Sequence, residues 1–137
     1  MKQRILVLCT GNSARSQMAE GLLRHMAGQR FEVFSAGTHP VGLNPNAVNV
    51  MSELGIDISA HRSKSVDEFS GQPFDYVLTV CDSAKESCPI FPGGGARLHH
   101  DFQDPAAAPA DQQLGMFRRV RDEIREWLTE FVRNRTA

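Results

Sequence analysis

The chain has 137 residues, a length that predicts a single domain over residues 1–137 with a core of its own. Fifteen lysine and arginine residues against sixteen aspartate and glutamate residues leave a formal charge of −1, which gives no support to a nucleic-acid or anionic-membrane partner. No apolar run approaches the roughly twenty residues of a membrane span and no signal peptide is evident, so we expect a cytoplasmic location. We also expect a monomer.

The first half of the chain predicts two strands and two helices. Residues 4–8 form a short aliphatic run typical of a buried parallel strand, and residues 16–27 follow as a helix. Residues 31–36 alternate like a second strand. Residues 45–54 predict a helix with proline in its first turn and Gly55 just past its end, and residues 62–69 predict a short helical turn.

The second half predicts two further strands, over residues 75–80 and 96–99, and one long helix over residues 111–133. Apolar residues recur in that helix at intervals of three and four. Strands that alternate with helices indicate the α/β class, here a three-layer αβα fold with a four-stranded parallel sheet flanked by helices. Ligands of such sheets bind at the carboxyl ends of the strands, where Cys9 and Cys81 are both expected.

The segment CTGNSARS, which joins the first strand to the first helix, has the pattern Cys-x5-Arg followed by serine. Five intervening residues let successive backbone N–H groups surround a tetrahedral oxyanion, and Arg15 can then bind two of its oxygens. These groups favour the thiolate of Cys9, the nucleophilic form of the side chain, and Ser16 can donate a hydrogen bond to its sulfur. The expected substrate-binding residues are Thr10, Gly11, Asn12, Ser13, Ala14, Arg15 and Ser16.

A purely structural interpretation of the same segment is an ordinary buried cysteine followed by an ordinary turn. A Cys-x5-Arg pattern without further context is so short that it favours this structural interpretation. The strand–loop–helix context, with Gly11 and Asn12 where the backbone needs unusual torsion angles, favours the oxyanion site instead.

Four segments carry a resemblance that spans nearly the whole chain: LCTGNSARSQMAEG, FSAGTHP, DYVLTVCDSAKESCP and HHDFQDPA. Together, in this order, they resemble the arsenate reductases built on the low-molecular-weight protein tyrosine phosphatase fold. The resemblance implies an enzyme of arsenic detoxification that reduces arsenate to arsenite. It also implies phosphate or sulfate as competing oxyanions and some phosphatase side activity.

The same resemblance implies a cascade through three cysteines. Cys9 forms a thiol–arsenate adduct, Cys81 attacks Cys9 as arsenite leaves, and Cys88 then forms a disulfide with Cys81. No bound cofactor is implied. The disulfide is reduced by an external thiol reductant, thioredoxin or else glutaredoxin with glutathione.

Other interpretations of the cysteine pair remain open. Cys81 and Cys88 can be a buried filler and an incidental thiol, or a static disulfide, which a reducing cytosol disfavours. They can also join His99 and His100 at a zinc ion, although these spacings differ from those of structural zinc sites. If the pair is idle, a phosphomonoesterase is the rival enzyme. A thiol-based oxyanion or redox sensor is the rival outside the enzymes.

Asp104-Pro105 matches the position at which the family carries its general acid, and Asp101 is a weaker candidate. The alternative is that Asp104 merely begins a turn before proline. Alanines 106–108 stand where phosphatases of this fold usually have tyrosines, which argues against a tyrosine phosphatase. Some relatives bind potassium beside the loop through Asn, Glu, Ser and Asp. Because Lys64 falls where that Asp would be, we expect no metal site. The histidines are expected in loops or at the surface.

Overall fold

The structure, a computed structural model, describes residues 2–82 and 95–135. Its sheet has four strands, β1 (Gln3–Cys9), β2 (Phe31–Gly37), β3 (Tyr76–Thr79) and β4 (Ala96–His99). They lie in the order β2-β1-β3-β4, and every neighbouring pair is parallel. β1 is therefore central, and its residues 5–9 are buried because neighbouring strands and both packed layers cover them.

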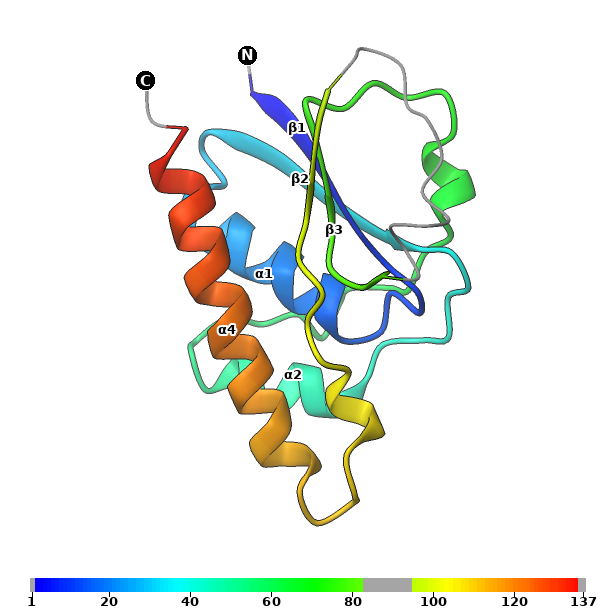
Figure 1. Ribbon diagram of the computed structural model, residues 1–137, viewed down its shortest axis with the longest axis vertical. Coiled ribbons are helices and arrows are strands. Elements are labelled where there is room, and N and C mark those ends of the chain that lie inside the picture. The colour runs from blue at the N-terminus through cyan, green and yellow to red at the C-terminus, as the bar shows by residue number, and fades with distance from the viewer. Residues whose placement is uncertain (1, 83–94, 136–137) are drawn as a thin grey trace.

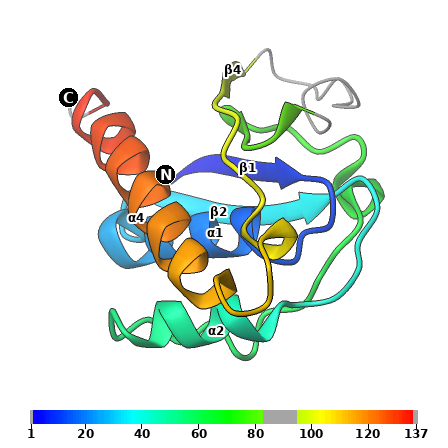
Figure 2. The ribbon, with the colours of Figure 1, turned by 60° about the horizontal axis from the view of Figure 1, so that its bottom comes forward.

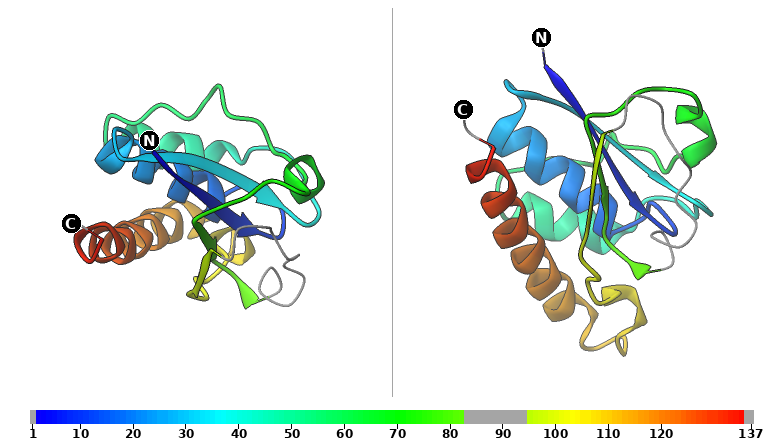
Figure 3. Two further views of the ribbon diagram at one scale, coloured as in Figure 1. Left: turned by 90° about the horizontal axis from the view of Figure 1, so that it is seen from above. Right: turned by 45° about the horizontal axis from the view of Figure 1, so that its top comes forward.

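Three α-helices pack together on the sheet: α1 (Arg15–Ala27), α2 (Pro45–Ser52) and α4 (Gln113–Arg133). Figure 2 shows all three on the same side of β1 and β2, and the right-hand view of Figure 3 shows α4 running beside α1. Two 3₁₀ helices complete the fold, η1 (Val66–Phe69) and η2 (Pro105–Ala107). No helix within residues 2–82 and 95–135 is long and apolar enough to cross a bilayer.

Residues on the two faces of β2 pack against different elements. Phe31 contacts Phe131 of α4, with ring centroids 6.0 Å apart. Phe34 packs against Phe69 of η1 and against Phe74 at 5.5 and 6.0 Å. Because successive side chains of a strand point to opposite faces, α4 covers one face of the sheet and the η1 segment covers the other.

The expected fold class is confirmed, and most element boundaries agree to within one or two residues. The helix expected over residues 45–54 ends at Ser52, because the chain tightens there into turns that lead to Gly55, whose φ is +75°. The last helix begins at Gln113 rather than at Asp111. The short turn expected within residues 62–69 is the 3₁₀ helix η1.

All four strands run in the same direction, so their carboxyl ends form one edge of the sheet (Figure 1). In register at this edge lie Cys9 beside Gly37, and Thr79 beside His99. The loop from β1 to α1 and the turn after β3 therefore begin next to each other. This juxtaposition builds the candidate active site.

Candidate active site

A cavity of about 280 Å³ opens over the loop that joins β1 to α1. Cys9 lies in its wall with only 2% of its surface exposed. His39, Val41 and Ala106 complete the wall, and none of them was expected as a site residue. The predicted site residues that line this cavity are Cys9, Thr10, Gly11, Ser13, Ala14, Arg15 and Asp104.

The carbonyl groups of the loop are bound by the segment that follows β2. The backbone N–H groups of Thr38, His39 and Val41 donate to the carbonyls of residues 9, 10 and 11, and Asn44 donates to that of residue 13. In a trans peptide the N–H group points away from its carbonyl. Because the loop carbonyls face the 38–44 segment, the loop N–H groups point to the opposite side. This arrangement suits an oxyanion.

Gly37 lets these two segments approach. A Cβ atom at this position would lie 2.5 Å from the carbonyl oxygen of Thr10 and 2.8 Å from the backbone nitrogen of Asn12. Both are backbone atoms of the loop, so neither can move aside without a change in the loop itself. Glycine at the end of β2 is thus a requirement of the site.

Asn12 holds the loop from behind. Its side chain is fully buried, and its backbone has φ of 45°, a left-handed conformation that asparagine tolerates better than most residues. Its Nδ2 donates to Ser16 Oγ at 2.8 Å and to Ser35 Oγ at 2.9 Å. Its Oδ1 accepts from Gln17 Nε2 at 3.0 Å and from the backbone N–H of Lys64 at 2.8 Å. The sequence predicted the backbone role of Asn12 and missed this side-chain network.

Ser16 connects that network to the predicted nucleophile, because its Oγ lies 2.9 Å from Cys9 Sγ. Ser16 is fully buried at the start of α1. A hydroxyl in this position can donate to a thiolate, and the amide of Asn12 fixes its orientation. The N-terminus of α1 adds a favourable electrostatic field for negative charge at the same place.

A buried carboxylate lies at the far end of the network. Glu20 is 3% exposed and accepts a hydrogen bond from Ser35 Oγ at 2.6 Å. Three basic side chains surround it, with nitrogen–oxygen distances of 3.2 Å for Arg24, 3.5 Å for His61 and 3.7 Å for Lys64. A buried carboxylate needs such partners to keep its charge.

Burial also affects the basic partners of Glu20. It lowers the pKa of the Lys64 ammonium, against the opposing attraction of the carboxylate. Burial lowers the pKa of His61 in the same way, so the neutral imidazole is favoured there. Lys64 thus places a cationic side chain of the protein beside Glu20, in the surroundings where the sequence predicted that it would exclude a metal ion.

The guanidinium of Arg15 is held at the mouth of the cavity. Its Nη1 donates to the backbone carbonyl of Phe102 at 3.0 Å. Phe102 is buried between His100 and Trp127, with ring centroids 4.1 and 5.5 Å away. The backbone after β4 therefore positions Arg15. The other N–H groups of its guanidinium can still donate to an anion.

Asp104 faces the same cavity from η2. Its Oδ1 accepts the N–H of Ala106 at 3.0 Å, as the N-cap of the 3₁₀ helix. The structure shows the turn interpretation, and this contact leaves the acid interpretation open because a carboxyl group has a second oxygen. Asp101 points elsewhere, since its Oδ1 accepts the backbone N–H of Asp82 at 3.2 Å.

Cys81 follows β3 and is 4% exposed. Its Sγ lies 3.4 Å from Oγ1 of Thr10, the residue next to Cys9. Two of the three cysteines thus lie at the same loop, and both are free thiols. Cys88 lies outside the described residues.

The histidines considered as zinc ligands make other contacts. His99 binds Thr79 Oγ1 through Nδ1 and Asp82 Oδ1 through Nε2, each at 2.8 Å. His100 stacks on Phe102. Residues 2–82 and 95–135 contain no cluster of three or more histidine, cysteine, aspartate or glutamate side chains suited to a metal ion.

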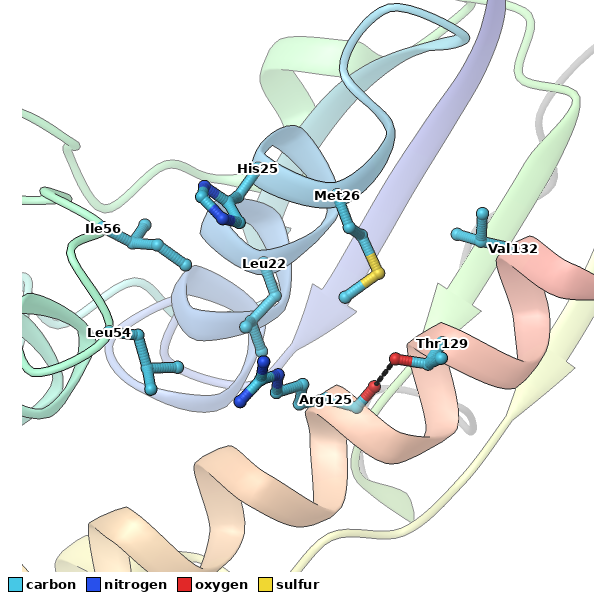
Figure 4. A pocket seen from close by; sticks show the side chains of 8 residues that line it. All are labelled: Leu22, His25, Met26, Leu54, Ile56, Arg125, Thr129 and Val132. Atoms are coloured by element: carbon cyan, nitrogen blue, oxygen red, sulfur yellow. Dashed lines mark hydrogen bonds between the residues drawn. The ribbon is translucent and has the colours of Figure 1, made fainter.

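A second cavity, of about 290 Å³, lies between α1 and α4 (Figure 4). Its walls are mostly apolar, and Arg125 reaches into it from α4 while His25 borders it from α1. No cysteine or carboxylate lines it. The cavity beside Cys9 is therefore the better candidate for catalysis.

Comparison with known proteins gives matches over nearly the whole chain. Residues 4–136 match the family model of the low molecular weight phosphotyrosine protein phosphatases. The arsenate reductase of Halalkalibacterium halodurans is 46% identical over 133 residues, which cover 96% of each chain. A solved arsenate reductase in the phosphate binding state aligns with a TM-score of 0.79 at 27% identity, covering 98% of this chain and 99% of that one. The low molecular weight protein tyrosine phosphatase from T. tengcongensis aligns with a TM-score of 0.80 at 29% identity, covering 97% and 99%.

Proposed function

The chain belongs to the low molecular weight phosphotyrosine protein phosphatase family, and we propose that within it this protein reduces arsenate to arsenite. One observation carries the proposal: a second buried thiol, Cys81, lies 3.4 Å from the hydroxyl of the anion-loop residue Thr10. A phosphatase has no use for a thiol there, whereas a reductase must obtain two electrons near its nucleophile. The arsenate reductase of Halalkalibacterium halodurans, 46% identical, supports the same choice.

In the first step the loop N–H groups and Arg15 hold arsenate, and the Cys9 thiolate attacks its arsenic. A sulfur–arsenic bond forms and an arsenic–oxygen bond breaks. Asp104, which lines the same cavity, donates a proton so that the oxygen leaves as water. Arsenic stays pentavalent in this step.

In the second step the Cys81 thiolate attacks the sulfur of Cys9. A disulfide forms, the sulfur–arsenic bond breaks, and its electron pair goes to arsenic, which becomes trivalent and leaves as arsenite. Each sulfur has lost one electron, so the two electrons gained by arsenic are balanced. Cys81 suits this step because its contact with Thr10 holds the sulfur at the loop.

In the third step the Cys88 thiolate attacks Cys81, and Cys9 leaves as a thiolate ready for another arsenate. The resulting Cys81–Cys88 disulfide needs two electrons from an external dithiol, thioredoxin or else glutaredoxin with glutathione. The loop, Cys9, Arg15 and Asp104 also suit hydrolysis of small phosphomonoesters, so we expect weak phosphatase side activity.

The test measures arsenate-dependent NADPH oxidation with thioredoxin and thioredoxin reductase, and again with glutaredoxin, glutathione and glutathione reductase. The wild-type protein should turn over with one of the two systems. Cys81→Ser and Cys88→Ser should lose turnover and keep hydrolysis of p-nitrophenyl phosphate. Cys9→Ser should lose both activities.

Three outcomes would contradict the proposal. No arsenate turnover with either reductant, together with phosphatase activity in all variants except Cys9→Ser, would favour the phosphomonoesterase. Arsenate reduction that survives Cys9→Ser would mean that the nucleophile is misassigned. Oxyanion binding without turnover of either substrate would favour the sensor.

A further inference from the structure

A single imidazole ring binds residues on both sides of Cys81. Nδ1 of His99 lies 2.8 Å from Oγ1 of Thr79, two residues before the cysteine. Nε2 lies 2.8 Å from Oδ1 of Asp82, the residue directly after it. The ring thus spans the stretch Thr79-Val80-Cys81-Asp82 from β4, the neighbouring strand.

The chemistry of these partners determines which ring nitrogen of His99 carries a hydrogen. A carboxylate only accepts hydrogen bonds, so Nε2 of His99 must carry a hydrogen. In the neutral ring Nδ1 then accepts from the hydroxyl of Thr79. In the charged ring Nδ1 donates, and the hydroxyl turns toward the carbonyl of Leu98, 3.5 Å away. Both forms of the ring keep both contacts, so either form can hold the stretch around Cys81 as a clamp.

Three further bonds tie the same turn to the segment after β4. Asp101 Oδ1 accepts the backbone N–H of Asp82 at 3.2 Å. The backbone N–H groups of residues 100 and 102 donate to the carbonyls of Thr79 and Val80 at 3.0 and 3.1 Å. β3 ends at Thr79, so Cys81 lies beyond the regular ladder and depends on such bonds for its position.

We propose that His99 is a positioning residue, which acts with Asp82 to hold Cys81 against the anion loop for the transfer between thiols. The inference rests on the proposed role of Cys81. Transfer between two sulfurs requires close approach and alignment, and displacement of about 1 Å can cost up to a hundredfold in rate. The clamp sets this approach because it fixes both neighbours of Val80-Cys81, while Thr10 contacts the sulfur itself.

The test is a single turnover without external reductant. Reduced protein is mixed with excess arsenate, and arsenite is separated from arsenate and quantified over time. His99→Ala and Asp82→Ala should each release arsenite about tenfold more slowly. Asp82→Asn keeps an acceptor oxygen at the same place and should stay within about twofold of the wild type. His25→Ala, a change of the same type at an exposed position of α1, is the matched control and should have no effect.

Two readouts separate positioning from a general loss of structure. Hydrolysis of p-nitrophenyl phosphate uses the loop and not Cys81, so it should stay within about twofold in His99→Ala. The double variant of His99 and Asp82 should be no slower than either single variant, because both changes open one clamp.

Arsenite release from His99→Ala at the wild-type rate would overturn the clamp, and so would an equal loss of phosphatase activity. In both cases Cys81→Ser would still fail to release arsenite, which leaves the proposed function standing. Arsenite release by Cys81→Ser would instead overturn the proposed function and the clamp together.

Discussion

Replacement of Asn12 by alanine tests the buried network behind the anion loop. The change removes four hydrogen bonds, made to Ser16, Ser35, Gln17 and the backbone N–H of Lys64. Gln17 keeps two backbone carbonyls as acceptors at 3.2 and 3.0 Å, so three bonds are lost without an alternative. At about 1 kcal/mol each they sum to about 3 kcal/mol.

Two smaller effects add to that loss. The backbone N–H of Lys64 is left without its acceptor. Alanine also adopts a φ of 45° at a higher energy cost than asparagine. We therefore expect Asn12→Ala to lower the free energy of unfolding by about 4 kcal/mol, a large part of the roughly 5–15 kcal/mol typical of a domain. Activity should fall as well, because Ser16 loses the donor that orients it toward Cys9.

The assay is urea unfolding followed by tryptophan fluorescence, with hydrolysis of p-nitrophenyl phosphate measured on the folded protein. Asn44→Ala is the matched control. Asn44 caps α2 through one hydrogen bond, to the N–H of Asn46 at 2.8 Å, and its loss should cost about 1 kcal/mol with activity retained. If Asn12→Ala destabilises the protein no more than Asn44→Ala, the side-chain network of Asn12 does not hold the loop.

Three further predictions concern the surroundings of the loop. Gly37→Ala should abolish oxyanion binding and phosphatase activity, because its Cβ would lie 2.5 Å from a backbone atom of the loop. The control Gly115→Ala, in α4, places its Cβ with no atom within 4 Å and should raise the free energy of unfolding by up to about 1 kcal/mol. An equal loss of phosphate binding in both variants, measured by calorimetry, would contradict the close approach at Gly37. Burial holds the pKa of His61 below its unfolded value of 6.5, so the unfolded chain binds more protons and stability falls as the pH drops below about 6.5. His61→Gln should therefore show a smaller loss of stability between pH 7 and 5.5 in urea titrations, and an unchanged loss would place the acid sensitivity elsewhere. Exchange of sodium for potassium at constant ionic strength should leave the arsenate reduction rate of the wild type unchanged, because Lys64 Nζ already lies 3.7 Å from Glu20 Oε1. The same exchange should raise the rate of Lys64→Ala. Activation of the wild type by potassium would contradict this.

The order of elements was predictable because each depends on a local pattern. Residues 5–8 form a short aliphatic run, and the apolar residues of α4 recur at intervals of three and four. The Cys-x5-Arg loop was predictable for the same reason, because its residues form one contiguous segment between β1 and α1. Ends of elements were less certain: Ser52 ends α2 two residues before the expected end, where turn bonds replace those of the helix.

The α/β class, the Cys-x5-Arg loop and the presence of further thiols follow from residues close together along the chain, so they can be predicted from the sequence. The contacts that support the loop and the thiols appear only in the folded structure. Arg15 is held by a carbonyl 87 positions away, and His99 binds a carboxylate 17 positions before it. Such bonds depend on which strands become neighbours at the carboxyl edge of the sheet, and no local periodicity records that. For this reason His99 looked like an ordinary surface histidine in the sequence, while in the structure its ring spans the residues around Cys81.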